Sequence, residues 1–213
     1  MMPSRSTLEA AADGQRAKIY GYLSQAFSYP DQTTLDSFSQ LWKMARHLSS
    51  DDGEDWNIDS LESLQAAYIA TLDGGARRHE QAHPYAGYWM DGERPQTLLD
   101  IQAFYRYFGF KLPAGAESPD HISVELAALA NLAKSGAQAP DATDSGPDRL
   151  GYILAQRDFL SRHVAPWMPK LSAELQEKTQ ASAYQQLARF AETFVKTDLA
   201  SLEARVGGTQ NPD

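Results

Sequence analysis

Apolar residues recur every three or four positions along most of this chain, and no segment alternates apolar and polar residues as a half-buried strand does. This spacing places the apolar side chains on one face of a helix, where they can pack against a core. It predicts helices over 11–27, 35–45, 61–72, 98–108, 122–133, 150–160, 167–175 and 184–194. The pattern therefore predicts an all-α fold, a single globular helical bundle.

Three interruptions of the pattern suggest how the bundle is divided. Gly74-Gly75 opens an irregular segment over 73–96, Gly109 follows the fourth helix, and residues 135–147 have the small, polar, proline-bearing composition of a linker. A hinge at that linker would allow two lobes, and one continuous bundle stays open. The predicted parts are a flexible N-terminus 1–14, an N-terminal helical part 15–134, the linker or hinge 135–147, a C-terminal helical part 148–205 and a flexible tail 206–213.

The stretch SPDH at 118–121 has the composition of a helix start. Ser118 is a good N-cap, and Pro119 suits the first helical position because its missing N–H costs nothing there. Asp120 would then lie at the positive end of the helix dipole. These residues predict that a helix begins at 118 and continues into 122–133.

Composition narrows the classes of function. With 213 residues and 42% hydrophobic content the chain can bury its own core, and without cysteine it has no disulfide or thiolate site. We find no secretory signal or apolar run of membrane-spanning length, so we expect a cytoplasmic protein with no stable membrane insertion. The net charge of −9 and the lack of long basic runs argue against nucleic acid as a partner and are compatible with a basic peptide.

The stretch HEQAH at 79–83 matches the H-E-x-x-H pattern of zinc hydrolases. That pattern needs both histidines on one helix, whereas His83 is followed by Pro84, which favours extended backbone. The longer zinc motif would also need glycine and histidine where this chain has Ala86 and Trp89. We therefore predict no metal and no catalytic residue here, and keep a zinc hydrolase only as a less favoured alternative.

Two other groups of residues allow more than one interpretation. His121 and Glu125 are one helical turn apart and could form a hydrogen-bonded pair, half of a metal site, or neither. Tyr85, Tyr88 and Trp89 stand in a segment rich in glycine and proline. They could seal the core or form the apolar wall of a binding groove.

The segment EXPDHIXXEL, here Glu117 to Leu126, resembles the signature of the TorD/DmsD/NarJ family of molybdoenzyme-specific chaperones. Three further stretches are similar to that family in order and spacing. They are the opening helix RAKIYGYLSQAFSYPD, the loop HPYAGYW followed by FYRYFGF, and the C-terminal DFLSRHVAPWMPKL. The resemblance covers roughly residues 15 to 200.

The resemblance implies a TorD-like all-α chaperone rather than an enzyme. Its partner would be the precursor of a molybdoenzyme catalytic subunit, bound through the twin-arginine signal peptide until cofactor insertion is complete. The implied peptide-binding residues are Pro119, Asp120 and His121, together with Glu125, and with Tyr85, Tyr88 and Trp89 as the apolar part. The Asp120 carboxylate, at a helix start after an exposed Ser-Pro, would suit an arginine.

Several points stay open at this stage. The chaperone itself is expected to hold no cofactor, while its client carries molybdopterin guanine dinucleotide, and weak guanine nucleotide binding is an open possibility implied by the family. A monomer and a domain-swapped dimer are both compatible with the linker. Pro119 and Asp120 could also do no more than start a helix, and the alternative function is a helical scaffold or regulator without peptide specificity.

Overall fold

The computed structural model describes residues 5–48, 56, 58–72, 82–91, 94–112, 115–143 and 146–209. The helices are α1 (Arg5–Ala26), α2 (Gln32–Leu48), α3 (Leu61–Thr71), α4 (Ala86–Trp89), α5 (Arg94–Tyr107), α6 (Ile122–Gln138), α7 (Arg149–Phe159), the π-helical turn η1 (Leu160–Val164), α8 (Met168–Lys178) and α9 (Ser182–Thr209). No strand occurs in these described ranges, and the predicted all-α fold is confirmed.

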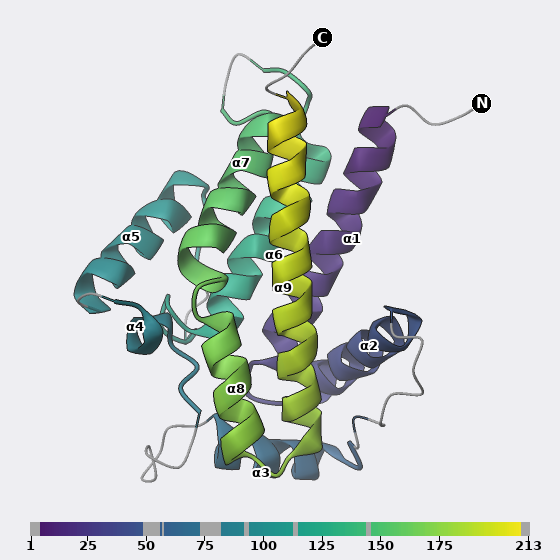
Figure 1. The fold of residues 1–213 in the computed structure, drawn as a ribbon, viewed down its shortest axis with the longest axis vertical. Helices are drawn as coiled ribbons and strands as arrows, with labels where there is room; N and C mark the ends of the chain where they lie inside the picture. The colour runs from purple at the N-terminus through teal and green to yellow at the C-terminus, as the bar shows by residue number, and fades with distance from the viewer. Residues whose placement is uncertain are drawn as a thin grey trace.

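Helix α6 lies inside the bundle, where α1 and α7 pack against it (Figure 1). The long helix α9 crosses in front and packs on α7 and α8, while α2 and α3 close the lower end. Helices α4 and α5 lie at the left-hand side of the view, next to α7 and α8. Most of α6 is buried, since its neighbours cover more than one face, and its small residues permit close packing.

The core is built from large apolar side chains that the helical spacing brings inward. Trp167, Tyr184, Phe27 and Phe38 are fully buried. The rings of Phe38 and Tyr184 meet edge to face at 5.7 Å between centroids, an arrangement favoured by the quadrupoles of aromatic rings. Complete burial of one such side chain stabilises the fold by about 1.5–3 kcal/mol. The helices are therefore held by tertiary packing.

A buried ion-pair network joins α1 to α9. The guanidinium of Arg16 donates from Nη2 to Oδ2 of Asp198 at 2.8 Å and also from Nε to Oδ1 of Asp198. Tyr20 donates its hydroxyl to the same carboxylate at 2.5 Å. Asp13 accepts from Arg16 at 2.8 Å and from Nη1 of Arg205 at 2.7 Å. We call these five residues the α1–α9 clamp.

Both terminal helices are longer than predicted. Helix α1 begins at Arg5, and Asp13 is fully buried in the clamp, so the predicted N-terminal segment 1–14 contains helical residues. Helix α9 continues to Thr209, and Val206 of the predicted tail 206–213 is buried. The clamp accounts for the longer α9, because Asp198 and Arg205 lie beyond the predicted end at 194. The flexibility of the two terminal segments stays a prediction.

The predicted linker 135–147 is shorter in the structure, because α6 continues to Gln138. Gly136 lies against α7, and a Cβ there would be 3.1 Å from the Cβ of Tyr152. The small residues that suggested a linker thus allow two helices to approach closely. The remaining connection joins α6 and α7, which pack against each other. Its use as a hinge for domain swapping stays a prediction.

Gly109 ends α5 as predicted, with a φ of +69° that favours glycine. The N–H of Phe110 donates to the carbonyl of Tyr105 at 2.8 Å, and the N–H of Gly109 to Arg106 at 3.2 Å. The rings of Phe110 and Tyr105 also pack edge to face, 4.9 Å apart. This is a Schellman ending, and it turns the chain from α5 towards the segment before α6.

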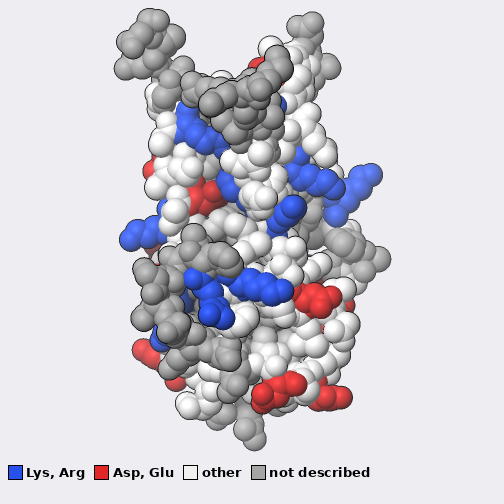
Figure 2. All heavy atoms as spheres, turned by 90° about the vertical axis from the view of Figure 1, so that its right-hand side faces the viewer, with Lys and Arg blue, Asp and Glu red and all other residues white. Residues whose placement is uncertain are grey.

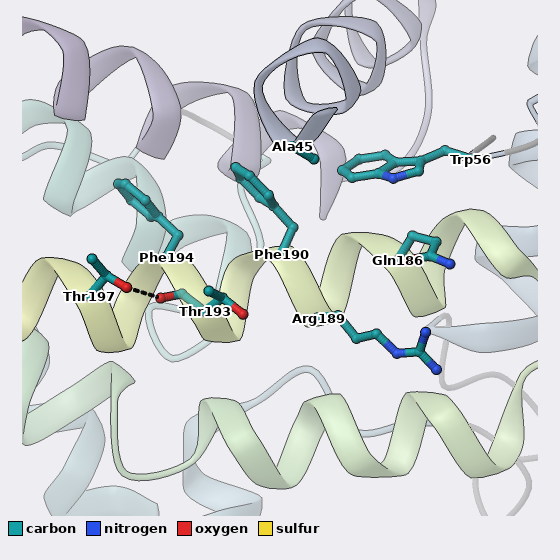
Figure 3. Close-up of a pocket in the computed structure, with 8 residues that line it drawn as sticks. All are labelled: Ala45, Trp56, Gln186, Arg189, Phe190, Thr193, Phe194 and Thr197. Carbon is teal, nitrogen blue, oxygen red and sulfur yellow. Dashed lines mark hydrogen bonds between the residues drawn. The ribbon is translucent and has the colours of Figure 1, made fainter. Parts of the chain in front are cut away.

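A surface pocket of about 370 Å³ lies where α2 meets α9 (Figure 3). Phe190 and Phe194 point from α9 towards the side of Ala45 and Trp56, whereas Arg189 leaves the helix in another direction. Among the helices that the structure describes, none is long and apolar enough to cross a lipid bilayer.

Candidate functional site

Two loop segments that are far apart in the sequence meet next to the start of α6. The N–H of Ala86 donates to the carbonyl of Asp120, and the N–H of Ile122 donates to the carbonyl of Pro84, both at 2.8 Å. Tyr85 and His121 thus form an isolated antiparallel bridge. The bridge brings the PYAGYW loop and the SPDH motif into one site, which we call the bridge site.

The prediction that helix α6 begins at Ser118 is wrong. The helix begins at Ile122, and its N-cap is His121, whose Nδ1 accepts from the N–H of Ser123 at 3.2 Å. The N–H of His121 donates to the carbonyl of Ser118 at 2.9 Å, so 118–121 form a turn before the helix. The carbonyl of Asp120 pairs with the PYAGYW loop, and this tertiary contact outweighs the local preference of Ser-Pro for a helix start.

The carboxylate of Asp120 is fully buried and accepts four hydrogen bonds. Arg94 donates from Nε to Oδ2 at 3.0 Å and from Nη2 to Oδ1 at 3.1 Å. Ser118 donates to Oδ1 at 2.6 Å, and the N–H of Gly87 donates to Oδ2 at 3.3 Å. Burial acts to raise the pKa of Asp120, but the bonds from Arg94 and Ser118 outweigh it, so the pKa lies below its ordinary value.

Arg94, the first residue of α5, reaches across the site while its own side chain stays 48% exposed. Its guanidinium carbon lies 5.2 Å from the centroid of the Tyr85 ring, a cation–π contact. The Tyr85 hydroxyl is 3.4 Å from Oε2 of Glu117, and burial followed by the charge of Glu117 raises the Tyr85 pKa. The site therefore combines a buried carboxylate, a bidentate arginine and an aromatic face.

Gly87 is required where the loop passes the ion pair. A Cβ at this position would overlap Cγ of Arg94 and lie 3.0 Å from Oδ2 of Asp120. We expect Gly87→Ala to displace Arg94 and to lower the free energy of unfolding by about 1–3 kcal/mol, the usual cost of overpacking. Urea denaturation measures this change. Gly21→Ala is the matched control, since a Cβ at Gly21 meets nothing within 4 Å in the interior of α1.

The free energy of unfolding of the control should rise rather than fall, because alanine is a better helix former than glycine at an open helical position. We expect Gly21→Ala to raise stability by about 0.5–1 kcal/mol. Equal effects of the two substitutions would contradict the close approach at Gly87.

The aromatic end of the loop is fixed to α8. The Tyr88 and His83 rings stack with centroids 3.6 Å apart, and the Trp89 indole donates to the His83 carbonyl at 2.8 Å. The N–H of His83 donates to Glu174 at 2.8 Å, and Lys170 donates to the carbonyl of Trp89 at 3.0 Å. Tyr88 is 57% exposed, so this loop presents an aromatic surface to solvent while its contacts with α8 fix it in place.

Two titratable residues of the motif are buried beneath the bridge site. His121 is 1% exposed, and burial lowers its pKa to about 4, an effect that the charge of Asp120 opposes. Glu125 is fully buried, and neither of its carboxyl oxygens has a hydrogen-bond partner among the described residues. The neighbouring Trp167 indole donates to the His163 carbonyl instead. Burial, followed by the charge of Asp120, raises the Glu125 pKa well above its ordinary value.

A pocket of about 330 Å³ lies beyond Trp89, between the start of α5 and η1. The exposed residues Asp91 and Asp100 contribute carboxylates to its lining, and Arg162 and His163 close the side formed by η1. In the described part of the chain, this pocket included, no three histidine, aspartate or glutamate side chains are grouped so as to hold a metal ion. Of the HEQAH stretch, residues 79–81 lie outside the described residues.

The structure brings some of the predicted site residues together and separates others. Asp120, His121 and Tyr85 meet at the bridge, and Pro119 stands in the adjoining turn. Tyr88 and Trp89 form the aromatic end of the same loop, whereas Glu125 points into the interior. The Asp120 carboxylate is fully buried, because donors from within the chain enclose it.

Sequence reasoning missed the residues that complete the bridge site. These residues are Gly87, Arg94, Glu117 in its contact with Tyr85, and Ser118 as a donor to Asp120. No local signal marks Arg94, which stands 26 residues from its carboxylate partner. Gly87 was the one usable sign, because a glycine often marks a close approach of the backbone to a neighbouring group.

The model of the nitrate reductase delta subunit family matches residues 32–173. A perchlorate reductase assembly chaperone protein of Dechloromonas aromatica is 26% identical, over 88% of this chain and 89% of that protein. A chlorate reductase assembly chaperone protein of Ideonella dechloratans is 30% identical, over 85% and 89%. Chaperone protein TorD of Vibrio cholerae is 27% identical, over 92% and 95%.

A solved structure supports the fold. The crystal structure of a redox enzyme maturation protein from Archaeoglobus fulgidus superposes with a TM-score of 0.51 at 21% identity. The match covers 88% of this chain and 93% of that one. The same all-α arrangement therefore extends over nearly the whole chain.

Proposed function

We propose that this chain binds the twin-arginine leader of one molybdoenzyme precursor. The premise is its family: the chain belongs to the nitrate reductase delta subunit family, together with the TorD-type assembly chaperones of molybdoenzymes. Its relatives are named as assembly chaperones and not as catalysts, so the chain is a chaperone rather than an enzyme. The leader and the place where it binds are the parts of this proposal that need a test.

The observation that carries the proposal is the meeting of the PYAGYW loop with the SPDH motif. Tyr85 and His121 are bridged through the backbone, and the Tyr85 ring meets the His121 ring at 5.1 Å. The site therefore combines an aromatic surface with a carboxylate whose geometry suits a bidentate arginine, a position that Arg94 of the chain itself fills in this structure. A leader needs both, because its two arginines are followed by an apolar stretch.

The neighbouring surface suits the rest of the leader. The exposed Tyr88 ring and the half-buried Trp89 would support the apolar stretch, since aromatic faces bind apolar chains at a low entropic cost. The carboxylates of Asp91 and Asp100 line the pocket directly beyond them and would receive the second arginine. The peptide would thus lie along α4 and the start of α5.

The opposite side of the molecule fits a basic peptide poorly. Figure 2 looks at the face of α1 and α2 and shows Lys and Arg side chains gathered across its upper and middle parts, although the chain carries a net charge of −9. Exposed Arg189 also borders the pocket between α2 and α9, and none of the described residues that line this pocket carries a carboxylate, whereas Asp91 and Asp100 accompany Arg162 in the pocket beyond Trp89. Two leader arginines would be repelled there, which favours the bridge site.

Leader binding can be tested with Tyr88→Ala. We expect the wild-type chain to bind a twin-arginine leader peptide from a molybdoenzyme of its host with micromolar or tighter affinity, measured by isothermal titration calorimetry. Removing the exposed Tyr88 ring should weaken binding about five- to tenfold, because an aromatic contact in an interface is worth about 1 kcal/mol or more.

The matched control is Tyr29→Ala. Tyr29 is 54% exposed, close to the 57% of Tyr88, but it stands in the turn after α1 and packs on Tyr68. This variant should bind the leader as the wild-type chain does. Failure of every host molybdoenzyme leader to bind the wild-type chain would refute the proposal, and an equal loss in both variants would place the leader elsewhere.

Leader binding would couple export to maturation. A leader held against the bridge site is withheld from the export machinery while the client receives its molybdopterin guanine dinucleotide. The chaperone would need no chemistry of its own for this role, only an affinity for the leader that ends when the client is complete. Release of the leader on client maturation is therefore part of the proposal.

A further inference from the structure

The Asp120 carboxylate is closed to any ligand while Arg94 is in place. Both of its oxygens receive two hydrogen bonds from within the chain, and the residue has no exposed surface. Two of the four bonds come from the Arg94 guanidinium, one from the Ser118 hydroxyl and one from the Gly87 N–H. Arg94 bonds both carboxylate oxygens from a side chain that is 48% exposed, so a change of its rotamer would free one bonding position on each oxygen.

The contacts of Arg94 are those that an arginine of a bound peptide would seek. Its guanidinium makes two parallel bonds to a carboxylate and lies 5.2 Å from an aromatic centroid. Bidentate pairing and stacking on an aromatic ring are the two features that distinguish arginine from lysine as a ligand. The position is therefore an arginine-binding site that is already filled from within.

We propose that Arg94 is an internal competitor for the first leader arginine, which binds Asp120 and Tyr85 only after the Arg94 side chain has moved into solvent. The inference rests on the proposed function, because it names the residue that sets leader affinity and selectivity at the same site. An arginine leader recovers every contact that Arg94 loses. A lysine leader recovers only the charge.

Two properties of binding follow. Arg94 competes at the high effective concentration of a tethered group, in the millimolar range, so the wild-type chain binds leaders less tightly than its site allows. Selectivity for arginine over lysine is increased, because displacement of a bidentate partner by a single ammonium is unfavourable. Leaders that cannot displace Arg94 from Asp120 would bind poorly, although nothing blocks them sterically.

The test compares Arg94→Ala with the wild-type chain, using a twin-arginine leader and the same leader with both arginines changed to lysine. We expect the arginine leader to bind about tenfold more tightly to Arg94→Ala, while the lysine leader gains at most about threefold from the lost positive charge. In Arg94→Ala with Asp120→Asn the gain of the arginine leader should disappear, because the carboxylate is gone.

Arg106→Ala is the matched control, since it removes an exposed arginine from the other end of the same helix. It should leave the affinity for both leaders within about twofold, because general attraction between exposed charges is weak in salt. Unchanged or weakened binding of the arginine leader by Arg94→Ala would overturn the inference. So would equal gains for the arginine and lysine leaders.

Two further measurements separate this inference from folding and from the proposed function. If Arg94→Ala does not fold, Arg94→Lys keeps Asp120 paired and should still bind the arginine leader more tightly than the wild-type chain. If no leader binds the wild-type chain, the proposed function fails. The inference about Arg94 is then tested with N-acetyl-arginine amide as the ligand. This compound should raise the melting temperature of Arg94→Ala but not that of the wild-type chain, and no rise in the variant would overturn the inference.

Discussion

Replacing Asp198 by alanine should destabilise the protein by about 3–5 kcal/mol, the cost of leaving one partner of a buried ion pair without its counter-ion. Asp198 is 4% exposed and holds both Arg16 and the hydroxyl of Tyr20. Removing its carboxylate leaves the Arg16 guanidinium, itself 9% exposed, with Asp13 alone, and Asp13 is already shared with Arg205. Urea denaturation, with the transition followed by circular dichroism, measures the loss.

An exposed ion pair provides the matched control. Asp141 pairs with Arg149 at 2.8 Å, but its side chain is 68% exposed, so Asp141→Ala should cost less than about 1 kcal/mol. A loss below about 1 kcal/mol for Asp198→Ala as well would show that the α1–α9 clamp contributes no more than a surface pair.

Glu125→Gln should be more stable than the wild-type chain at neutral pH, and the difference should grow as the pH rises. The folded-state pKa of Glu125 is raised well above its ordinary value of 4.5, first by burial and then by the charge of Asp120. Above pH 4.5 the unfolded chain ionises while the folded carboxyl keeps its proton, so stability falls with rising pH. The slope is about 1.4 kcal/mol per pH unit until the folded-state pKa is passed.

The measurement is the free energy of unfolding of both proteins in urea between about pH 5 and pH 8. Glutamine is neutral throughout, so the difference between the two proteins isolates the carboxyl of Glu125. Glu203→Gln is the control, because Glu203 is exposed on α9 and its charge is hydrated in both states. A difference between wild type and Glu125→Gln that does not change with pH would mean that Glu125 has a partner or water when ionised.

Helical spacing predicted where the helices lie, because burial of one face is a local property of the sequence. It could not predict the polar contacts that join distant parts of the chain. Asp198 and Arg16 are separated by 182 positions, and nothing in either neighbourhood marks them as partners. The last helix was predicted too short for the same reason, since Asp198 and Arg205 of the clamp lie beyond its predicted end at 194.

The candidate site illustrates the same division. Tyr85, Asp120 and His121 could be selected from the sequence through the family resemblance, and the structure places them together. Asp120 was expected at the positive end of the helix dipole, and nothing near it in the sequence indicated that its carboxylate is buried. The turn at 118–121 and the side chain of Arg94 enclose it, and Arg94 stands 26 residues away at the start of α5.

The clamp also decides when the chain can finish folding during its own synthesis. Helix α1 is made early with Asp13 as a partner of Arg16, but Asp198, the second carboxylate of the pair, is added 182 residues later. At about 5–20 residues per second, roughly 9 to 36 s pass between the two. Contact between α1 and α6, such as the bond from Ser24 to the carbonyl of Ser123 at 2.7 Å, can form within that interval. A nascent chain halted before α9 would therefore hold a partly assembled bundle in which Arg16 has Asp13 but not Asp198 as a partner, and synthesis of α9 would be needed to close the clamp.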